Sequence, residues 1–328
     1  MYADAVFEGG GVRGIAFVGA LSVAEARGYE WQRVGGTSVG AITAALVAAG
    51  YRAEELRPIM ENFDLTFLLG RRGWLRLPLL GKGIQLWRNI GIYSTEPLAE
   101  WVGGLLAQKG LITFADLADR YGDRERLQVV ATDVTEGRVV VLPRDLPRYG
   151  IDPAAFPIAL AVCISSAVPL LFQPLTLSAK GGTPHLLMDG GLLSNFPVWL
   201  FDVEGMPRWP TFGFRLLGEM EERPLRKNSF PSVMKSVLET LIGSLDDMYI
   251  PQPDVVRTVT IPTGRFQPFQ FSLEREEKRQ LIARGKEAAE AFFAAWDFPR
   301  YVRLYRCGTQ GHPEGSRSQP SNAWRHQQ

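Results

Sequence analysis

Short apolar runs alternate with longer segments of helical character along the first part of the chain. An apolar run at residues 3–7 stops at an acidic residue and three glycines, and residues 12–27 then carry small and apolar side chains at helical spacing. A second short run at 31–34 ends at two glycines and precedes an Ala-rich segment at 39–49. This repeated order of strand, tight turn and helix predicts a mostly parallel sheet with helices on both faces.

The same criteria extend the α/β pattern through most of the chain. Further strands are predicted at residues 127–132, 139–142, 186–188, 211–216 and 255–261. Further helices are predicted at residues 53–63, 95–108, 153–165, 232–248 and 273–296. From Gly308 onward the chain is rich in Gly, Pro, Ser and Gln with almost no apolar residues, which predicts a disordered tail over 308–328.

Composition and charge narrow the class of protein. The 328 residues are 46% hydrophobic and 22% charged, which is typical of a globular protein. With 36 basic and 35 acidic residues, no overall field favours nucleic acid, so any binding to an anionic surface must be local.

Cys163 and Cys307 lie far apart without Cys or His partners at metal-ligand spacing, so neither disulfides nor a zinc site are expected. The N-terminus leaves no room for a signal peptide, and no apolar run reaches the roughly 18 residues of a membrane span. We therefore expect a cytoplasmic protein that is at most peripheral to a membrane.

A Gly-rich turn at residues 9–14 (GGGVRG) separates the first predicted strand from its helix. Free backbone N–H groups and the helix dipole favour negative charge there, so the turn suits an anion. The alternatives are a plain tight turn and, because the residues match G-x-G-x-x-G, the dinucleotide site of an oxidoreductase. The second alternative requires an acidic residue at the end of the second strand, but that strand ends in GGTS and Glu30 precedes it.

A serine turn follows at residues 36–40 (GTSVG), which match G-x-S-x-G between a predicted strand and a helix. In that context the motif forms a sharp turn that exposes the serine hydroxyl, and the flanking glycines let the turn close. Ser38 is therefore a candidate nucleophile. The alternative is that Ser38 only caps the following helix.

A serine nucleophile needs a base, and histidine is scarce in this chain. His312 and His326 lie in the predicted tail and His185 lies in a turn, so each is expected at the surface. An ordinary α/β-hydrolase using His312 would keep the order Ser, Asp, His, but its serine would normally follow several strands. The best remaining base is Asp189, which ends an apolar strand and precedes two glycines. Burial there would raise its pKa and make it a better base, while the alternative is a simple Asp-Gly turn.

Residues 9–14, 36–40 and 189–191 (DGG) together resemble the three signature blocks of the patatin-like phospholipases in order and spacing. Between them, residues 163–174 (CISSAVPLLFQP) are similar to the Ser-Ala-x-x-Pro stretch of that family. The resemblance covers about residues 3–217. It implies a three-layer α/β/α sandwich and a catalytic Ser-Asp dyad, which would account for the missing histidine.

The resemblance also implies roles for single residues. Ser38 would be the acyl nucleophile and Asp189 the base. The backbone N–H groups of Gly10, Gly11 and Val12 would form the oxyanion hole, with Arg13 shaping that loop. The supporting glycines of the motifs would be Gly9, Gly14, Gly36, Gly40, Gly190 and Gly191.

The expected activity is that of a lipid acyl hydrolase of phospholipase A or lysophospholipase type, acting on a phospholipid or other fatty-acyl ester without a cofactor. An inactive lipid-binding protein on the same fold is the alternative. The expected organisation is a catalytic core over 1–217, a helical and strand part over 218–307 packed on the same domain, and the tail.

Residues 66–92 are a candidate contact with lipid. They interleave Leu, Phe, Ile and two Trp with five basic residues and almost no acidic ones. Tryptophan and cations are both favoured at the headgroup boundary of a bilayer, so the segment suits peripheral membrane contact. The alternative is a loop and helix pair packed on the core with its cations solvated.

Overall fold

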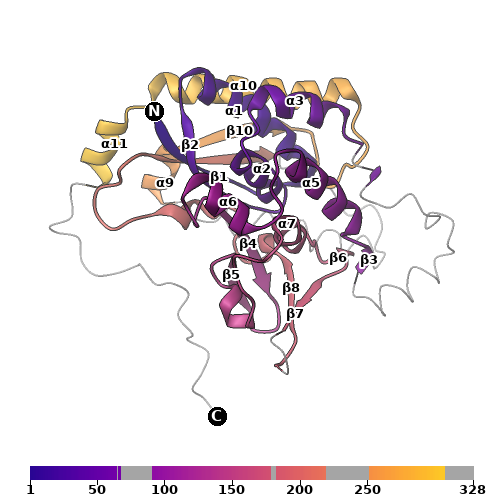
Figure 1. Cartoon of the computed structure of the whole chain (residues 1–328). Coiled ribbons are helices and arrows are strands. Elements are labelled where there is room, and N and C mark those ends of the chain that lie inside the picture. The colour runs from indigo at the N-terminus through magenta and orange to yellow at the C-terminus, as the bar shows by residue number, and fades with distance from the viewer. Residues whose placement is uncertain (65, 68–90, 179–181, 219–250, 307–328) are drawn as a thin grey trace, which may run out of the picture.

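The computed structural model describes residues 1–64, 66–67, 91–178, 182–218 and 251–306 (Figure 1). Its strands are β1 (Tyr2–Phe7), β2 (Glu30–Thr37), β3 (Gly91–Tyr93), β4 (Leu127–Asp133), β5 (Arg138–Leu142), β6 (Leu170–Phe172), β7 (Leu175–Leu177), β8 (His185–Asp189), β9 (Thr211–Gly218) and β10 (Thr258–Gly264). Its α-helices are α1 (Phe17–Ala26), α2 (Val39–Ala48), α3 (Ala53–Asn62), α5 (Glu96–Gln108), α6 (Phe114–Tyr121), α7 (Ile158–Ser165), α9 (Gln252–Val256), α10 (Arg275–Ala295) and α11 (Phe298–Tyr305). Short 3-10 helices are η1 (Gly11–Ala16), η4 (Leu146–Tyr149), η5 (Gly190–Leu192) and η6 (Val198–Phe201).

A mixed sheet with the strand order β10-β9-β1-β2-β4-β8-β7 forms the centre of the fold, and β5 also pairs with β4. The strands from β10 to β4 are parallel to their neighbours, whereas β5 and β8 run antiparallel to β4 and β7 runs antiparallel to β8. Helices cover both faces of this sheet, so that helices, sheet and helices form three layers, which confirms the predicted α/β/α class. The strands β3 and β6 form a separate two-stranded sheet beside it.

Two of the helices that cover the sheet, α1 and α10, cross at very short range. A side chain on Gly19 of α1 would collide with the Ile282 carbonyl, and one on Gly285 of α10 would collide with the Ala16 carbonyl. Glycine at both positions therefore allows the two backbones to touch. In Figure 1 these helices lie together with α3 along the top of the molecule, so the last long helix packs on the first.

Several predicted boundaries differ from those observed. The second strand continues through Gly35, Gly36 and Thr37 because these residues pair with β1 on one side and β4 on the other. The strand predicted at 255–261 begins only at Thr258, since α9 occupies 252–256, and the helix predicted at 153–165 begins at Ile158. The helices α6 and α11 are not among the predicted elements. The helix predicted at 232–248 and the predicted tail lie outside the described residues.

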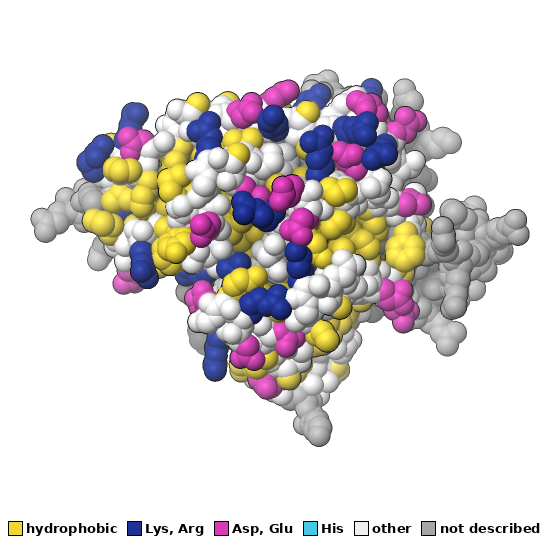
Figure 2. All heavy atoms as spheres, turned by 45° about the horizontal axis from the view of Figure 1, so that its top comes forward, with side chains coloured by type: hydrophobic (Ala, Val, Ile, Leu, Met, Phe, Trp, Pro, Cys, Tyr) yellow, Lys and Arg dark blue, Asp and Glu magenta, His cyan; other side chains and the backbone are white. Residues whose placement is uncertain are grey.

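The described surface has no large region of one charge on the face shown in Figure 2, where basic and acidic side chains are interspersed. This agrees with the formal net charge of +1. Across the described ranges, no helix combines the length and the apolar character needed to cross a bilayer.

Candidate active site

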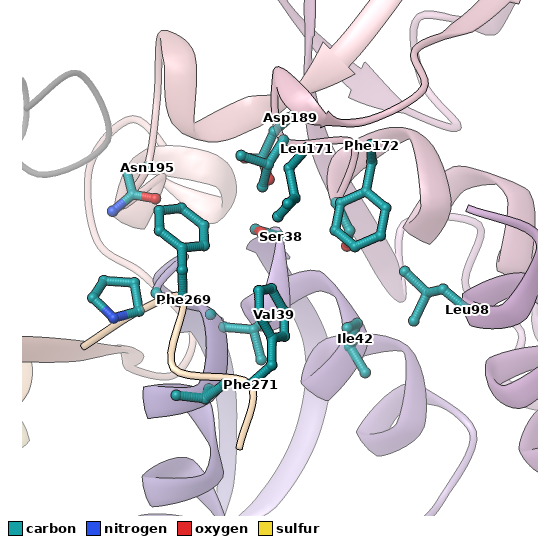
Figure 3. A pocket seen from close by; sticks show the side chains of 16 residues that line it. Ser38, Val39, Ile42, Leu98, Leu171, Phe172, Asp189, Asn195, Phe269 and Phe271 are labelled. Atoms are coloured by element: carbon teal, nitrogen blue, oxygen red, sulfur yellow. The ribbon is translucent and has the colours of Figure 1, made fainter. Parts of the chain in front are cut away.

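The sheet brings the ends of β2 and β8 together along one edge of β4. Strand β2 runs parallel to β4 and ends with Thr37 opposite Val130. Strand β8 runs the other way and ends with Asp189 opposite Ala131, the next residue of β4. The two strands thus meet end to end, and Ser38, which follows β2 directly, lies beside Asp189 (Figure 3). Residues 151 positions apart in the sequence become neighbours because both strands pair with β4.

Ser38 forms the sharp turn between β2 and α2. Its φ of 55° is positive, a conformation that costs a non-glycine residue free energy and is found mostly at functional sites. A side chain on Gly36 would meet the backbone of Gly40, and one on Gly40 would meet the Phe7 carbonyl, so both glycines permit the tight path. Although Ser38 occupies the N-cap position of α2, its hydroxyl makes no capping hydrogen bond. The helix-capping alternative therefore does not account for this serine.

Asp189 is 1% exposed, and burial raises the pKa of its carboxyl group to about 6. Its Oδ1 atom accepts a hydrogen bond from the Gly191 N–H at 2.7 Å, so the Asp-Gly turn foreseen as an alternative is also present. Oδ2 has no partner of full hydrogen-bond geometry among the described residues. The Ser38 hydroxyl is nevertheless near enough to help the Gly191 N–H lower the pKa of this carboxyl group, so the candidate nucleophile lies close to it.

The Gly-rich turn offers backbone donors at the same place. Within the described ranges, the N–H groups of Gly10 and Gly11 have no acceptor, and both residues line the pocket that contains Ser38. The third predicted donor, the Val12 N–H, donates to the Pro268 carbonyl at 3.0 Å. Val12 could bind an oxyanion only if that bond were exchanged.

Hydrogen bonds tie this turn to the segment after Asp189. The Gly9 N–H donates to the Asn195 carbonyl at 3.0 Å, and the Asn195 side-chain amide donates back to the Gly9 carbonyl at 3.3 Å. Arg13 donates through Nε to the Gly10 carbonyl at 3.3 Å, and its role in shaping the loop stays a prediction. The three sequence blocks thus form one continuous structure around Ser38.

An apolar pocket of about 680 Å³, including its open mouth, opens beside Ser38 (Figure 3). Its walls come from α2, α5, β6 and the segment between β10 and α10. The apolar side chains that line it include Val39, Ile42, Leu98, Val168, Leu171, Phe172, Pro268, Phe269 and Phe271. A pocket lined mostly by apolar side chains suits a hydrocarbon chain.

His185 lies at the start of β8, whereas Asp189 ends that strand. Its Nδ1 atom lies 2.9 Å from Asp133 Oδ2, and Glu136 is near enough for the three residues to share a metal ion. Asp133, however, already accepts hydrogen bonds from the Thr135 and Glu136 N–H groups and from the Tyr149 hydroxyl. These hydrogen bonds account for the position of Asp133 in the turn after β4, and no metal is assigned to the three residues.

Some residues singled out by the sequence lie outside the described ranges, namely His312, His326, Cys307 and residues 68–90. Conversely, the structure adds Ser165, Ala167 and Asn195, which bond directly to the site. The signal for the first two is the stretch CISSAVP, to which the sequence alone assigns no role. The signal for Asn195 is the sequence LLSNFP, which follows the Asp189 block directly.

The fold and the site define the class: an α/β/α protein with a serine in a strained strand-to-helix turn and a buried carboxylate beside it. The chain belongs to the patatin-like phospholipase family, whose profile matches residues 5–202. By family it is therefore a lipid hydrolase. This membership favours the lipid-hydrolase prediction over the dinucleotide-binding alternative.

Individual relatives agree with this assignment. The protein YqhO of Bacillus subtilis (strain 168) is 36% identical over 301 residues, which cover 91% of this chain and all of YqhO. The Mycobacterium tuberculosis protein Rv1063c, named as an NTE family protein, is 26% identical over 73% of this chain and 55% of its own length. Among solved structures, VipD from Legionella pneumophila has the same fold with a TM-score of 0.55 at 20% identity, over 89% of this chain and 67% of VipD.

Proposed function

We propose that the protein hydrolyses fatty-acyl esters of lipids through a Ser38–Asp189 dyad. The observation that carries this proposal is the meeting of β2 and β8 along β4, where a strained serine lies beside a buried carboxylate and both line an apolar pocket. A carboxylate with a pKa of about 6 is ionised at neutral pH yet is a stronger base than an exposed one. The arrangement therefore needs no histidine to activate the serine.

The reaction proceeds in two halves. Asp189 accepts the Ser38 hydroxyl proton as Oγ bonds to the ester carbonyl carbon, and the tetrahedral intermediate then expels the alcohol, which takes that proton from Asp189. This leaves the acyl group on Ser38 Oγ. Water attacks the acyl carbon while Asp189 accepts its proton, and the C–Oγ bond breaks as Ser38 Oγ recovers a proton from Asp189. The products are one alcohol and one fatty acid, and the enzyme is restored.

The oxyanion of each tetrahedral intermediate would be held by the N–H groups of Gly10 and Gly11. These donors have no acceptor among the described residues, so they do not have to break another bond first. The N-terminus of α2, which begins at Val39 directly after Ser38, adds a favourable dipole. One such donor lowers the barrier by about 3 kcal/mol in other acyl-transfer enzymes.

The substrate side of the proposal rests on the pocket. Phe172 and Leu98 face it from one side and Phe271 from another, so an acyl chain would be surrounded by hydrocarbon (Figure 3). A phospholipid or another fatty-acyl ester supplies such a chain. Contact of residues 66–92 with a membrane surface stays a prediction, since all but four residues of that segment lie outside the described ranges.

The test compares the wild type with Ser38→Ala and Asp189→Asn on a phospholipid that carries two different acyl chains. Released fatty acid is identified by mass spectrometry, which also shows the position cleaved. We expect release by the wild type and a loss of about a thousandfold or more in both variants. Ser22→Ala is the matched control, because among the described residues the Ser22 hydroxyl bonds only to the Gly19 carbonyl of its own helix. Folded wild type without activity on any acyl ester would instead support the inactive lipid-binding alternative.

A further inference from the structure

The short segment Ser165–Ala167 bonds to the backbone of both proposed catalytic residues. The Ser38 N–H donates to Ser165 Oγ at 2.9 Å. Two residues later, the Ala167 carbonyl accepts a hydrogen bond from the Asp189 N–H at 3.0 Å. A stretch of three residues at the C-terminal end of α7 therefore bonds to the backbone of both the candidate nucleophile and the candidate base.

The Ser165 hydroxyl also reaches the strand between them. It donates to the Val130 carbonyl at 2.5 Å, and Ser165 is 0% exposed, so water does not compete for these bonds. Val130 lies opposite Thr37 in the β2–β4 ladder, and the following residue of β4 lies opposite Asp189. The Ser165 hydroxyl thus bridges the Ser38 N–H, just past the end of β2, and the Val130 carbonyl of β4. Val130 is the last residue of β4 that pairs with β2, and the next residue pairs with β8.

The bridge made by the Ser165 hydroxyl holds the backbone at Ser38, whose conformation is unfavourable without support from its surroundings. The φ of 55° at Ser38 is unfavourable for any side chain and must be held by its surroundings. A bond to the Ser38 N–H fixes the peptide plane before the Cα atom, and that plane sets the direction in which Oγ leaves the backbone. Without this hydrogen bond, the turn is free to relax, and Ser38 Oγ is free to move away from Asp189.

We propose that Ser165 is a positioning residue that holds the Ser38 turn against β4, so that the Ser38 hydroxyl stays aligned with Asp189. This inference rests on the proposed function of the Ser38–Asp189 pair. Ser165 touches neither the substrate nor the reacting atoms in this role. Its contribution is therefore to the chemical step rather than to lipid binding.

The experiment measures kcat and KM on a soluble short-chain ester for Ser165→Ala, Ser165→Cys and a matched control. The control is Thr263→Val, because the Thr263 hydroxyl is equally buried and bonds the Leu217 carbonyl at 3.1 Å between β10 and β9, and not the backbone of Ser38 or Asp189. Cysteine fills the volume of serine but is a weak donor and acceptor, so it separates the loss of hydrogen bonds from the loss of packing. Thermal melts of all variants report folding.

We expect kcat of Ser165→Ala to fall about 10- to 100-fold with KM within about twofold of wild type. Ser165→Cys should fall towards Ser165→Ala, while Thr263→Val keeps wild-type kinetics. If Ser165→Ala fails to give a cooperative melt, the Ser165→Cys variant decides the matter alone. Wild-type kcat in Ser165→Cys, or a Ser165→Ala variant no slower than Thr263→Val, would overturn the positioning role.

A second readout separates this inference from the proposed function. A small serine-directed phosphonate forms a bond to Ser38 Oγ without needing a lipid-binding step, and its leaving group departs as the P–O bond forms. Labelling of wild type that slows in Ser165→Ala supports positioning. Labelling at equal rates overturns it and leaves the dyad standing, whereas a wild type that neither labels nor hydrolyses esters overturns both.

Discussion

Asp189 is the residue whose surroundings most directly shape the proposed chemistry. Burial raises the pKa of its carboxyl group, and the Gly191 N–H and the Ser38 hydroxyl hold that rise to about 6. With less burial the carboxylate would be a weaker base, and without these donors its pKa would be higher still. The balance between the two effects leaves an ionised base at neutral pH.

The first prediction concerns the dependence of activity on pH. The base must be ionised, so kcat/KM should rise with pH through about 6 and fall about tenfold for each pH unit below it. A soluble ester avoids effects of pH on lipid aggregates, and circular dichroism at pH 5 checks that the protein stays folded. Full activity at pH 4.5 would exclude Asp189 as the base.

The second prediction concerns Gly11. Its φ is +56°, and an added side chain would collide with the Pro268 carbonyl, so Gly11→Ala should displace the donor loop. We expect kcat to fall about 100- to 1,000-fold, as when an oxyanion donor is removed. Gly122→Ala is the matched control, since Gly122 has a φ of +67° with open space around it at the end of α6. Equal kinetics for the two variants would contradict the assigned role of the loop.

At the level of elements, the parallel strands of the sheet can be predicted from the sequence. The pairing of β8 with β4, which brings Asp189 to Ser38, cannot. Apolar runs and Gly turns mark β1, β2 and the helices after them, because these features are local. Whether β8 pairs with β4 depends on contacts between residues far apart in the chain. The sequence therefore indicates Ser38 and Asp189 separately, while their meeting rests on the register of both strands against β4.

Glycine misled the prediction of element ends. Gly35 and Gly36 suggested a turn, yet a side chain on Gly35 would meet Leu200 and one on Gly36 the backbone of Gly40. These glycines are there because other parts of the chain pass close to the strand. Such a requirement comes from tertiary packing and leaves no local signal that distinguishes it from a turn.

The third prediction concerns the segment between β10 and α10, which supplies part of the pocket wall. Phe271 is half-buried, so Phe271→Ala should enlarge the apolar space at small cost to folding. The ratio of kcat/KM for long over short acyl esters should rise about tenfold. Phe292→Ala, which removes another half-buried ring from the aromatic cluster of α10, is the control. An unchanged ratio in Phe271→Ala would place the acyl chain elsewhere.

On the scale of the whole molecule, the site lowers the stability of the fold that contains it. The unfolded chain releases the Asp189 proton near the ordinary pKa of 3.8, whereas the folded chain keeps it up to about pH 6. Between these values the folded state binds more protons, so the free energy of unfolding falls as pH rises. Above about pH 6 the protein carries the full cost of the buried charge.

The fourth prediction follows from this cost. Asp189→Asn removes the charge and keeps an oxygen for the Gly191 N–H, so the variant should be more stable than the wild type at pH 8. A pKa rise from 3.8 to about 6 sets an upper limit of about 3 kcal/mol, at about 1.4 kcal/mol per pH unit. The gain should vanish at pH 4. Urea unfolding at both pH values measures it, and a variant less stable than wild type at pH 8 would contradict the account.

The bond between the Val12 N–H and the Pro268 carbonyl joins the Gly-rich turn to a segment that the ribosome makes much later. The ribosome releases Ser38 and Asp189 long before the residues that follow β10. A nascent chain that has reached residue 250 holds both members of the dyad but lacks β10, α10 and the phenylalanines at 269 and 271 that wall the pocket. The proposed activity therefore becomes possible only after residue 271 has been made, and a chain that stops before that residue cannot build the pocket in which an acyl ester would be cleaved.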